Sequence, residues 1–160
     1  MIKTLVLVRH GKAQPISAAA SDFDRELLPA GEKALRETYP TTFALLGGEP
    51  DIHIWSSPAA RALGTAEVIG EVLGIDPDEF ELHDEVYEQD FDATLSAILS
   101  AEPETVVLVG HIPLVEDIAA RLGAGLSFET GAAACFSMPA ATAIPRLKWF
   151  VQGPKVGKSF

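Results

Sequence analysis

Two histidines and two arginines are the residues in this sequence whose types are best suited to catalysis. They are Arg9, His10, Arg61 and His111. An imidazole can act as a covalent nucleophile. A guanidinium stays charged and can grip two oxygens of a phosphoryl group at once. Phosphoryl transfer depends mainly on positioning and charge stabilisation, which such a set can supply without a metal. These residue types point to phosphoryl chemistry if the fold brings them together.

Short apolar runs that alternate with helical patterns must position these four side chains. Strands are predicted at residues 2–8, 51–55, 79–82 and 105–109, with two late strands near 132–138 and 144–151. Helices are predicted from Pro29 or Gly31 to about Pro40, over 57–73, around 95–99 and over 114–122. Strands that alternate with helices predict an α/β fold, a three-layer sandwich with a mostly parallel central sheet flanked by helices. The last one or two strands are expected to be antiparallel edge strands.

The four residues follow predicted strands, at the sheet edge where open α/β sheets bind ligands. Helix N-termini at the same edge offer free N–H groups to an anion. Gly11 lets the backbone approach an anion closely. Ser57 and Pro58 are interpreted as the N-cap and first residue of a helix, and Ser57 is a further candidate phosphate ligand. We therefore expect a phosphate-binding set made of Arg9, Gly11, Ser57, Arg61 and His111.

The sequence resembles the histidine phosphatase superfamily, which includes the phosphoglycerate mutases. The resemblance spans roughly residues 2–150, and its motifs are Arg9-His10-Gly11, Ser57-Pro58-Ala59-Ala60-Arg61-Ala62 with Thr65-Ala66-Glu67, and Val109-Gly110-His111-Ile112-Pro113. The short chain and the segment Asp22-Phe23-Asp24-Arg25 make it most similar to the SixA-type phosphohistidine phosphatases. Gly64 departs from the pattern, because relatives often have glutamine there, and Pro40 is expected to end or kink the first helix.

The resemblance implies a role for each central residue. His10 attacks phosphorus, while Arg9, Arg61 and His111 hold the phosphoryl oxygens, and water hydrolyses the intermediate. Glu85 is the best match for a general acid that protonates the leaving group, with Asp84 in reserve. His10 must be neutral and His111 is more useful protonated, so a bell-shaped pH–rate curve is expected.

The composition limits the class of protein. The chain has 160 residues, of which 48% are apolar and 22% charged, and we interpret residues 1–160 as one domain. A net charge of −11 disfavours nucleic acid, although Arg146, Lys148, Lys155 and Lys158 form a mildly basic tail. No apolar run is long enough for a membrane span or a signal peptide. With one cysteine, Cys135, the chain is expected to be cytoplasmic.

Hydrolysis through phospho-His10 is the leading hypothesis. A protein phosphohistidine substrate is favoured because the chain has little spare length for a lid, so the site should be open. The alternatives are a small-molecule phosphomonoesterase and a non-catalytic phosphate-binding module. No cofactor is expected. A metal site is disfavoured because no His-x-x-x-His or cysteine pair exists and two arginines would repel a cation. Cys135 is not a Cys-x5-Arg nucleophile, since residue 141 is alanine.

Overall fold

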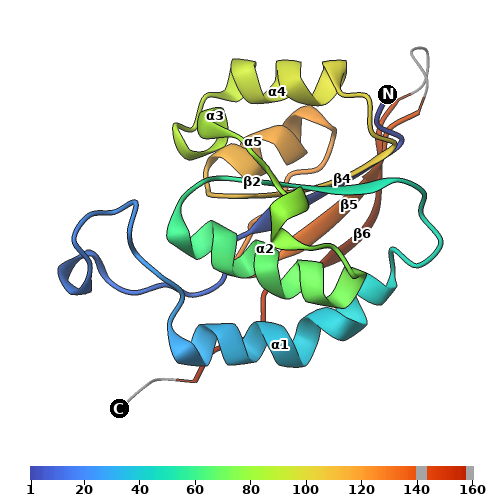
Figure 1. Ribbon diagram of the computed structural model, residues 1–160. Helices are drawn as coiled ribbons and strands as arrows, with labels where there is room; N and C mark the ends of the chain where they lie inside the picture. Colours follow the sequence, from blue (N-terminus) through green and yellow to red (C-terminus); the bar gives the residue numbers. More distant parts are fainter. Residues whose placement is uncertain (140–143, 158–160) are drawn as a thin grey trace.

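The computed structural model describes residues 1–139 and 144–157 of the chain. Within this part, six strands form one sheet in the order β3-β2-β4-β1-β5-β6, with helices on both of its faces (Figure 1). The strands are β1 (Thr4–Arg9), β2 (Ile52–Ser56), β3 (Glu81–Leu82), β4 (Thr105–Gly110), β5 (Ala133–Ser137) and β6 (Arg146–Val151).

Strands β1 and β4 lie side by side in the middle of the sheet. They pair in parallel, from Thr4 opposite Thr105 to Arg9 opposite Gly110. Both are buried almost throughout. A strand covered on both faces needs apolar side chains at every position rather than at alternate ones. That requirement explains the two continuous apolar runs in the sequence, and it places Arg9 and Gly110 at the same end of neighbouring strands.

The sheet is mixed, which corrects the prediction of a mostly parallel sheet, whereas the expected antiparallel pairing at its last strand, β6, is confirmed. The pairs β2–β3, β2–β4 and β1–β4 are parallel, whereas β1–β5 and β5–β6 are antiparallel. Strand β5 therefore lies inside the sheet. Apolar content does not encode strand direction. The direction of β5 is set by residues 123–132, which return the chain to the end of β1, where the Arg9 N–H donates to the Ala132 carbonyl.

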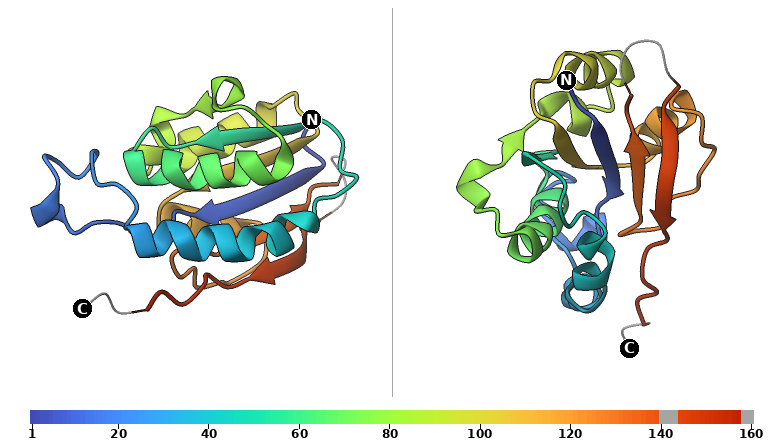
Figure 2. Two further views of the ribbon diagram at one scale, coloured as in Figure 1. Left: turned by 60° about the horizontal axis from the view of Figure 1, so that its bottom comes forward. Right: turned by 90° about the vertical axis from the view of Figure 1, so that its right-hand side faces the viewer.

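The helices form two outer layers, one on each face of the sheet (Figures 1 and 2). On one face, α1 (Pro29–Ala44) and α2 (Ala60–Leu73) contribute to a core with Val6, Val8 and Val107. On the other face lie α3 (Asp84–Tyr87), α4 (Phe91–Ser100) and α5 (Leu114–Arg121), whose apolar side chains join a second core. Two short 3-10 helices occupy Ile16–Ala18 and Pro77–Glu79.

Two helix boundaries differ from the sequence prediction. Helix α1 continues through Pro40 to Ala44, because Tyr39 and Phe43, each 1% exposed, anchor both sides of the proline in the core. Helix α2 begins at Ala60, with Ala59 rather than Ser57 as its N-cap. The predicted end of α2 is confirmed, since Gly74 has a φ of 74° and closes the helix in the left-handed region.

Two segments lie outside the sheet and its two helical layers. Residues 12–28 extend away from it beyond the ends of β1 and β2 (Figures 1 and 2), and a bridge between Ala13 and Leu27 closes the base of this loop. The segment after β6 runs past the same end of β1. Lys158, the last residue of the predicted basic tail, lies outside the described residues. No helix in the described ranges has the length and apolar content to cross a membrane.

Candidate functional site

The fold brings His10 and His111 together at the ends of the two central strands. Their ring centroids lie 5.2 Å apart, with the ring planes tilted by 56°. His10 is 8% exposed and His111 is 4% exposed. The parallel register places them side by side, because Arg9 of β1 is opposite Gly110 of β4 and each histidine is the next residue.

A backbone hydrogen bond orients the His10 ring. Its Nδ1 lies 2.7 Å from the carbonyl oxygen of Gly11. A carbonyl can only accept, so Nδ1 carries the proton and donates it. The lone pair of the neutral ring is then on Nε2, where a nucleophile needs it.

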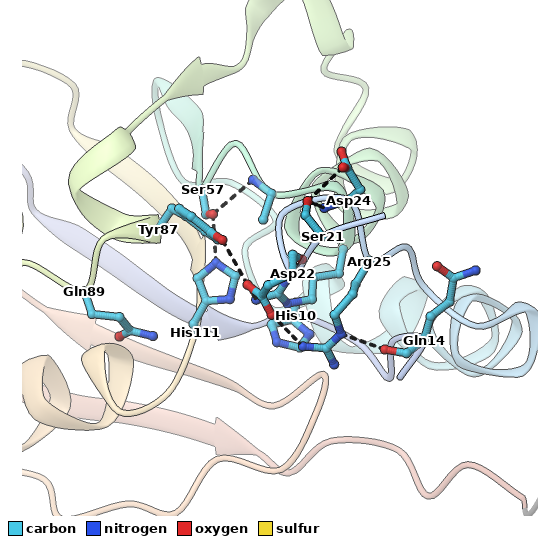
Figure 3. Close-up of polar contacts among 12 residues, drawn as sticks. His10, Gln14, Ser21, Asp22, Asp24, Arg25, Ser57, Tyr87, Gln89 and His111 are labelled. Atoms are coloured by element: carbon cyan, nitrogen blue, oxygen red, sulfur yellow. Dashed lines mark hydrogen bonds and ion pairs between the residues drawn. The ribbon is translucent and has the colours of Figure 1, made fainter. Parts of the chain in front are cut away.

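His111 is oriented by Ser57, which follows β2. The His111 Nε2 lies 2.8 Å from the Ser57 hydroxyl oxygen, as Figure 3 shows. The same oxygen accepts from the Ala59 N–H at 3.2 Å, which leaves the hydroxyl proton free to be donated to Nε2. In that arrangement His111 carries its own proton on Nδ1, an atom that is buried and has no hydrogen-bond partner among the described residues. Ser57 therefore acts on His111 rather than as the predicted helix cap.

Burial keeps both histidines uncharged at neutral pH. It is the main cause that lowers the pKa of His10 to about 3, with a smaller contribution from the positive charges around it. The pKa of His111 falls to about 4, again chiefly through burial and then through the charge of Arg61. Removing an imidazolium from water costs free energy, and nearby arginines add repulsion. In the ligand-free chain His111 is therefore neutral, whereas the expected catalytic form is protonated.

Both predicted arginines border this pair. The Arg9 Nη1 donates to the carbonyl of Phe128 at 2.9 Å. The Arg61 Nη1 donates to the backbone carbonyl of Asp22 at 2.7 Å, and its Nη2 lies 3.2 Å from the Asp22 carboxylate. The Nε atoms of Arg9 and Arg61 are buried without a partner among the described residues. Each guanidinium is thus fixed by hydrogen bonds from its Nη atoms, while its Nε–H has no acceptor among the described residues.

Asp22 is the residue that sequence reasoning about the site missed most clearly. Its carboxylate accepts from Arg25 and from Tyr87, each at 2.9 Å (Figure 3). It also accepts from Arg61. The hydrogen bond from Arg25 is the largest cause that lowers the pKa of Asp22 to about 2. Tyr87 also stacks edge-on against His111, with centroids 5.8 Å apart. The only signal in the sequence was the resemblance of residues 22–25 to SixA-type proteins, which assigned these side chains no contacts.

Gly11 has a different role from the one predicted. Its N–H donates to the Thr65 hydroxyl at 2.9 Å, and its carbonyl accepts from His10. Its backbone is therefore already engaged rather than free to bind an anion. A Cβ at this position would lie 2.7 Å from the Leu35 side chain. A larger residue here would have to displace the Leu35 side chain of α1.

The candidate general acid lies beside another histidine. The Glu85 carboxylate is 2.5 Å from the Nδ1 of His83, and the His83 ring stacks on Trp55 with centroids 4.2 Å apart. No hydrogen bond or ion pair of the described residues joins Glu85 to His10 or His111. The reserve candidate, Asp84, begins α3 and is exposed. The general-acid assignment stays a prediction. The described residues contain no cluster of three or more His, Cys, Asp or Glu side chains that could hold a metal ion.

Comparison with known proteins identifies the family. The sequence pattern of the histidine phosphatase superfamily (branch 1) matches residues 5–96, more than half of the chain. The chain belongs to the histidine phosphatase superfamily. The match includes His10, Arg61 and Glu85, whereas His111 lies beyond it. No curated protein sequence matches significantly.

Solved structures of other histidine phosphatases extend the likeness over nearly the whole chain. A SixA protein of Agrobacterium tumefaciens, named as a phosphohistidine phosphatase, is 29% identical with a TM-score of 0.78, and the match covers 94% of this chain and 98% of that one. The protein histidine phosphatase SixA complexed with tungstate is 26% identical with a TM-score of 0.79, over 93% and 96%. A phosphoserine phosphatase of Entamoeba histolytica is 20% identical with a TM-score of 0.64, over 92% and 95%, and shares the fold alone.

Proposed function

We propose that the chain, as one domain, hydrolyses phosphoryl groups through a covalent intermediate on His10. The observation that carries this proposal is the arrangement around His10, a buried and uncharged imidazole whose Nδ1 is held by Gly11. Three buried nitrogens of its neighbours have no partner among the described residues, namely Arg9 Nε, Arg61 Nε and His111 Nδ1. A phosphoryl group supplies acceptor oxygens, so its binding would satisfy donors that are otherwise costly to bury.

The proposed hydrolysis has two steps. The lone pair on His10 Nε2 attacks phosphorus, and the bond from phosphorus to the leaving group breaks. Arg9, Arg61 and His111 stabilise the charge on the transferred oxygens. Water then attacks the phosphohistidine, the P–N bond breaks, and inorganic phosphate leaves with His10 neutral again. No step needs a metal ion or an oxidant.

Bound phosphate changes the protonation of His111. The dianion is an opposite charge beside the ring, so it raises the pKa of His111 from its ligand-free value of about 4. The added proton on Nε2 would face the Ser57 oxygen, and the charged ring would make the Nδ1–H a stronger donor to the phosphoryl oxygens. Because His10 must stay neutral while His111 becomes charged, we expect a bell-shaped dependence of rate on pH, with two pKa values that belong to the coupled pair.

Protein phosphohistidine is the substrate that we favour. The two SixA structures, at 29% and 26% identity, are named for this activity, and tungstate is an oxyanion with the tetrahedral shape of phosphate. The site is built at the ends of three strands rather than under a separate domain. A small-molecule phosphomonoesterase and a non-catalytic phosphate-binding module are the alternatives, and the following experiment separates the second of them from an enzyme.

The decisive measurement is the intact mass of the protein after brief mixing with a phosphodonor, without an acid quench. Wild type is expected to gain one phosphoryl group transiently and to release phosphate, whereas His10→Ala gains none. His53→Ala is the matched control, because His53 is an exposed histidine bonded to Asp51, and it should behave as wild type. Absence of both adduct and turnover with ester, acyl-phosphate and phosphohistidine donors would favour the binding-module alternative.

Glu85 is proposed as the general acid for ester substrates alone. An imidazole leaving group needs less protonation than an alkoxide, so Glu85→Gln should lower phosphomonoester hydrolysis by roughly hundredfold and phosphohistidine hydrolysis much less. In the ligand-free chain the carboxylate contacts His83, which it must leave to act. Equal loss of both activities in Glu85→Gln would contradict this role.

A further inference from the structure

A basic hollow borders the two-histidine site on the side of Arg9. Its volume is about 450 Å³. Lys12 lines it from the segment after β1, Glu129 and Thr130 from the segment before β5, and Lys155 from the segment after β6. The hollow therefore joins three parts of the chain that are distant in sequence, and the roles described for the phosphoryl site use only Arg9 among its residues.

Three of the five described lysines and arginines without a carboxylate partner line this hollow, the other two being Arg121 and Arg146. Six of the described lysines and arginines pair with carboxylates, namely Lys3, Arg25, Lys33, Arg36, Arg61 and Lys148. The Arg9, Lys12 and Lys155 side chains have no such partner within 4.0 Å in the described ranges. In a chain of net charge −11, carboxylates are plentiful. The three unpaired cations around this hollow are thus available to bind an external anion.

Arg9 connects this hollow to the reacting atoms. Its positive charge contributes to the lowered pKa of both His10 and His111, which places it beside the pair. Its Nη1 is fixed by Phe128, and its Nε is unpartnered among the described residues. An anion bound between Lys12 and Lys155 would therefore lie next to a phosphoryl group held by the other side of Arg9.

We propose that the hollow binds a second anionic group of the substrate, the carboxylate of an acidic side chain close in sequence to the phosphohistidine. This inference rests on the proposed function. The carboxylate of Glu129 lines the hollow, and that of Glu116 acts on Arg9, so both oppose an incoming anion and limit the affinity. An exposed ion pair contributes about 0.2–1 kcal/mol, which corresponds to roughly a 1.5- to fivefold effect for each cation.

The test uses pairs of phosphohistidine peptides that differ at one position, where one peptide has glutamate and the other has glutamine. That position is moved in turn through the three residues on either side of the phosphohistidine. The readout is the ratio of kcat/KM for the two peptides. Wild type is expected to favour the best-placed glutamate by about fivefold. The double variant Lys12→Gln/Lys155→Gln should bring that ratio close to one, and Glu129→Gln should raise it. High salt should reduce the ratio in wild type.

Arg121→Gln is the matched control, since it removes one unpaired cation at the end of α5, at the opposite end of the sheet from the hollow. It should keep the wild-type ratio. Equal hydrolysis of all peptides by wild type would overturn the second subsite while leaving the proposed function intact. Discrimination only between small phosphorylated carboxylic acids and neutral phosphoesters would overturn the peptide assignment. Hydrolysis of no peptide would overturn both proposals.

Discussion

One hydroxyl group connects the backbone beside His10 to helix α2. The Thr65 side chain accepts from the Gly11 N–H and donates to the Arg61 carbonyl, each at 2.9 Å. Gly11 in turn fixes the His10 ring. The orientation of His10 thus depends on a residue of α2, and we regard Thr65 as a positioning residue for the proposed nucleophile.

Thr65→Val should lower the free energy of unfolding by about 1–3 kcal/mol, because it leaves the Gly11 N–H buried without a partner. Thr94→Val is a matched control. Thr94 is also buried, at 1% exposure, but its hydroxyl has no partner among the described residues. Its replacement should be neutral or slightly stabilising. Chemical denaturation of both variants measures the difference, and equal losses would contradict the role of the Thr65 hydroxyl.

At the scale of the elements, the loop 12–28 is fastened to the body by a carboxylate. Asp22 reaches Arg61 on α2 and Tyr87 at the end of α3. The Ala60 N–H also donates to the Phe23 carbonyl, and the Phe23 ring packs edge-on against Tyr87, with centroids 5.2 Å apart. The loop therefore forms one wall of the site rather than a loose connection.

Asp22→Asn should loosen this wall while leaving the core intact. Because the substitution removes the negative charge that attracts Arg25 and Arg61, we expect amide hydrogen exchange in residues 14–27 to become about two- to fivefold faster for each ion pair removed, with little change in the unfolding temperature. Asp24→Asn is the control, since within residues 1–139 and 144–157 the Asp24 carboxylate has only one hydrogen-bond partner, Ser21 of the same loop. Unchanged exchange in Asp22→Asn would show that the carboxylate does not hold the loop.

The sequence predicted the residues that follow the central strands, whereas it did not predict the contacts of the loop 12–28. The two central histidines were predictable because each directly follows an apolar run, and parallel strands align their ends. Asp22 was not predictable from its pattern, because two of its three partners, Arg61 and Tyr87, come from distant segments and a loop has no periodicity to orient it. The start of α2 was missed for a similar reason. Ser57 was interpreted through its local context, whereas its hydroxyl contacts His111 across the sheet.

At the scale of the whole molecule, the two buried histidines make stability depend on pH. Their folded pKa values of about 3 and about 4 lie below the unfolded value of about 6.5. Below pH 6.5 the unfolded chain therefore binds more protons than the folded one, so stability is full above that pH and falls as the pH drops towards 4. Burial of the two histidines thus lowers the free energy of unfolding only at acidic pH.

Between pH 7 and pH 5 we expect the free energy of unfolding to fall by about 2 kcal/mol for each of these histidines. His10→Gln and His111→Gln should each remove about that part of the pH dependence, as measured by denaturant titration at both pH values. Saturating tungstate should also reduce the loss in wild type, because an anion favours protonated His111. A wild-type pH dependence in both variants would contradict the lowered pKa values.

The position of β1 in the sheet has a consequence during synthesis. This strand is synthesised before the other strands of the sheet, yet both of its neighbours come much later in the sequence, since Thr4 pairs with Thr105 of β4 and with Ser137 of β5. Contacts that span so many residues form late, after the cost of closing a long loop has been met. Arg9 and His10 are thus translated before their partners and can meet them only after β4 and β5 have been synthesised. Until then a growing chain carries His10 without the site around it.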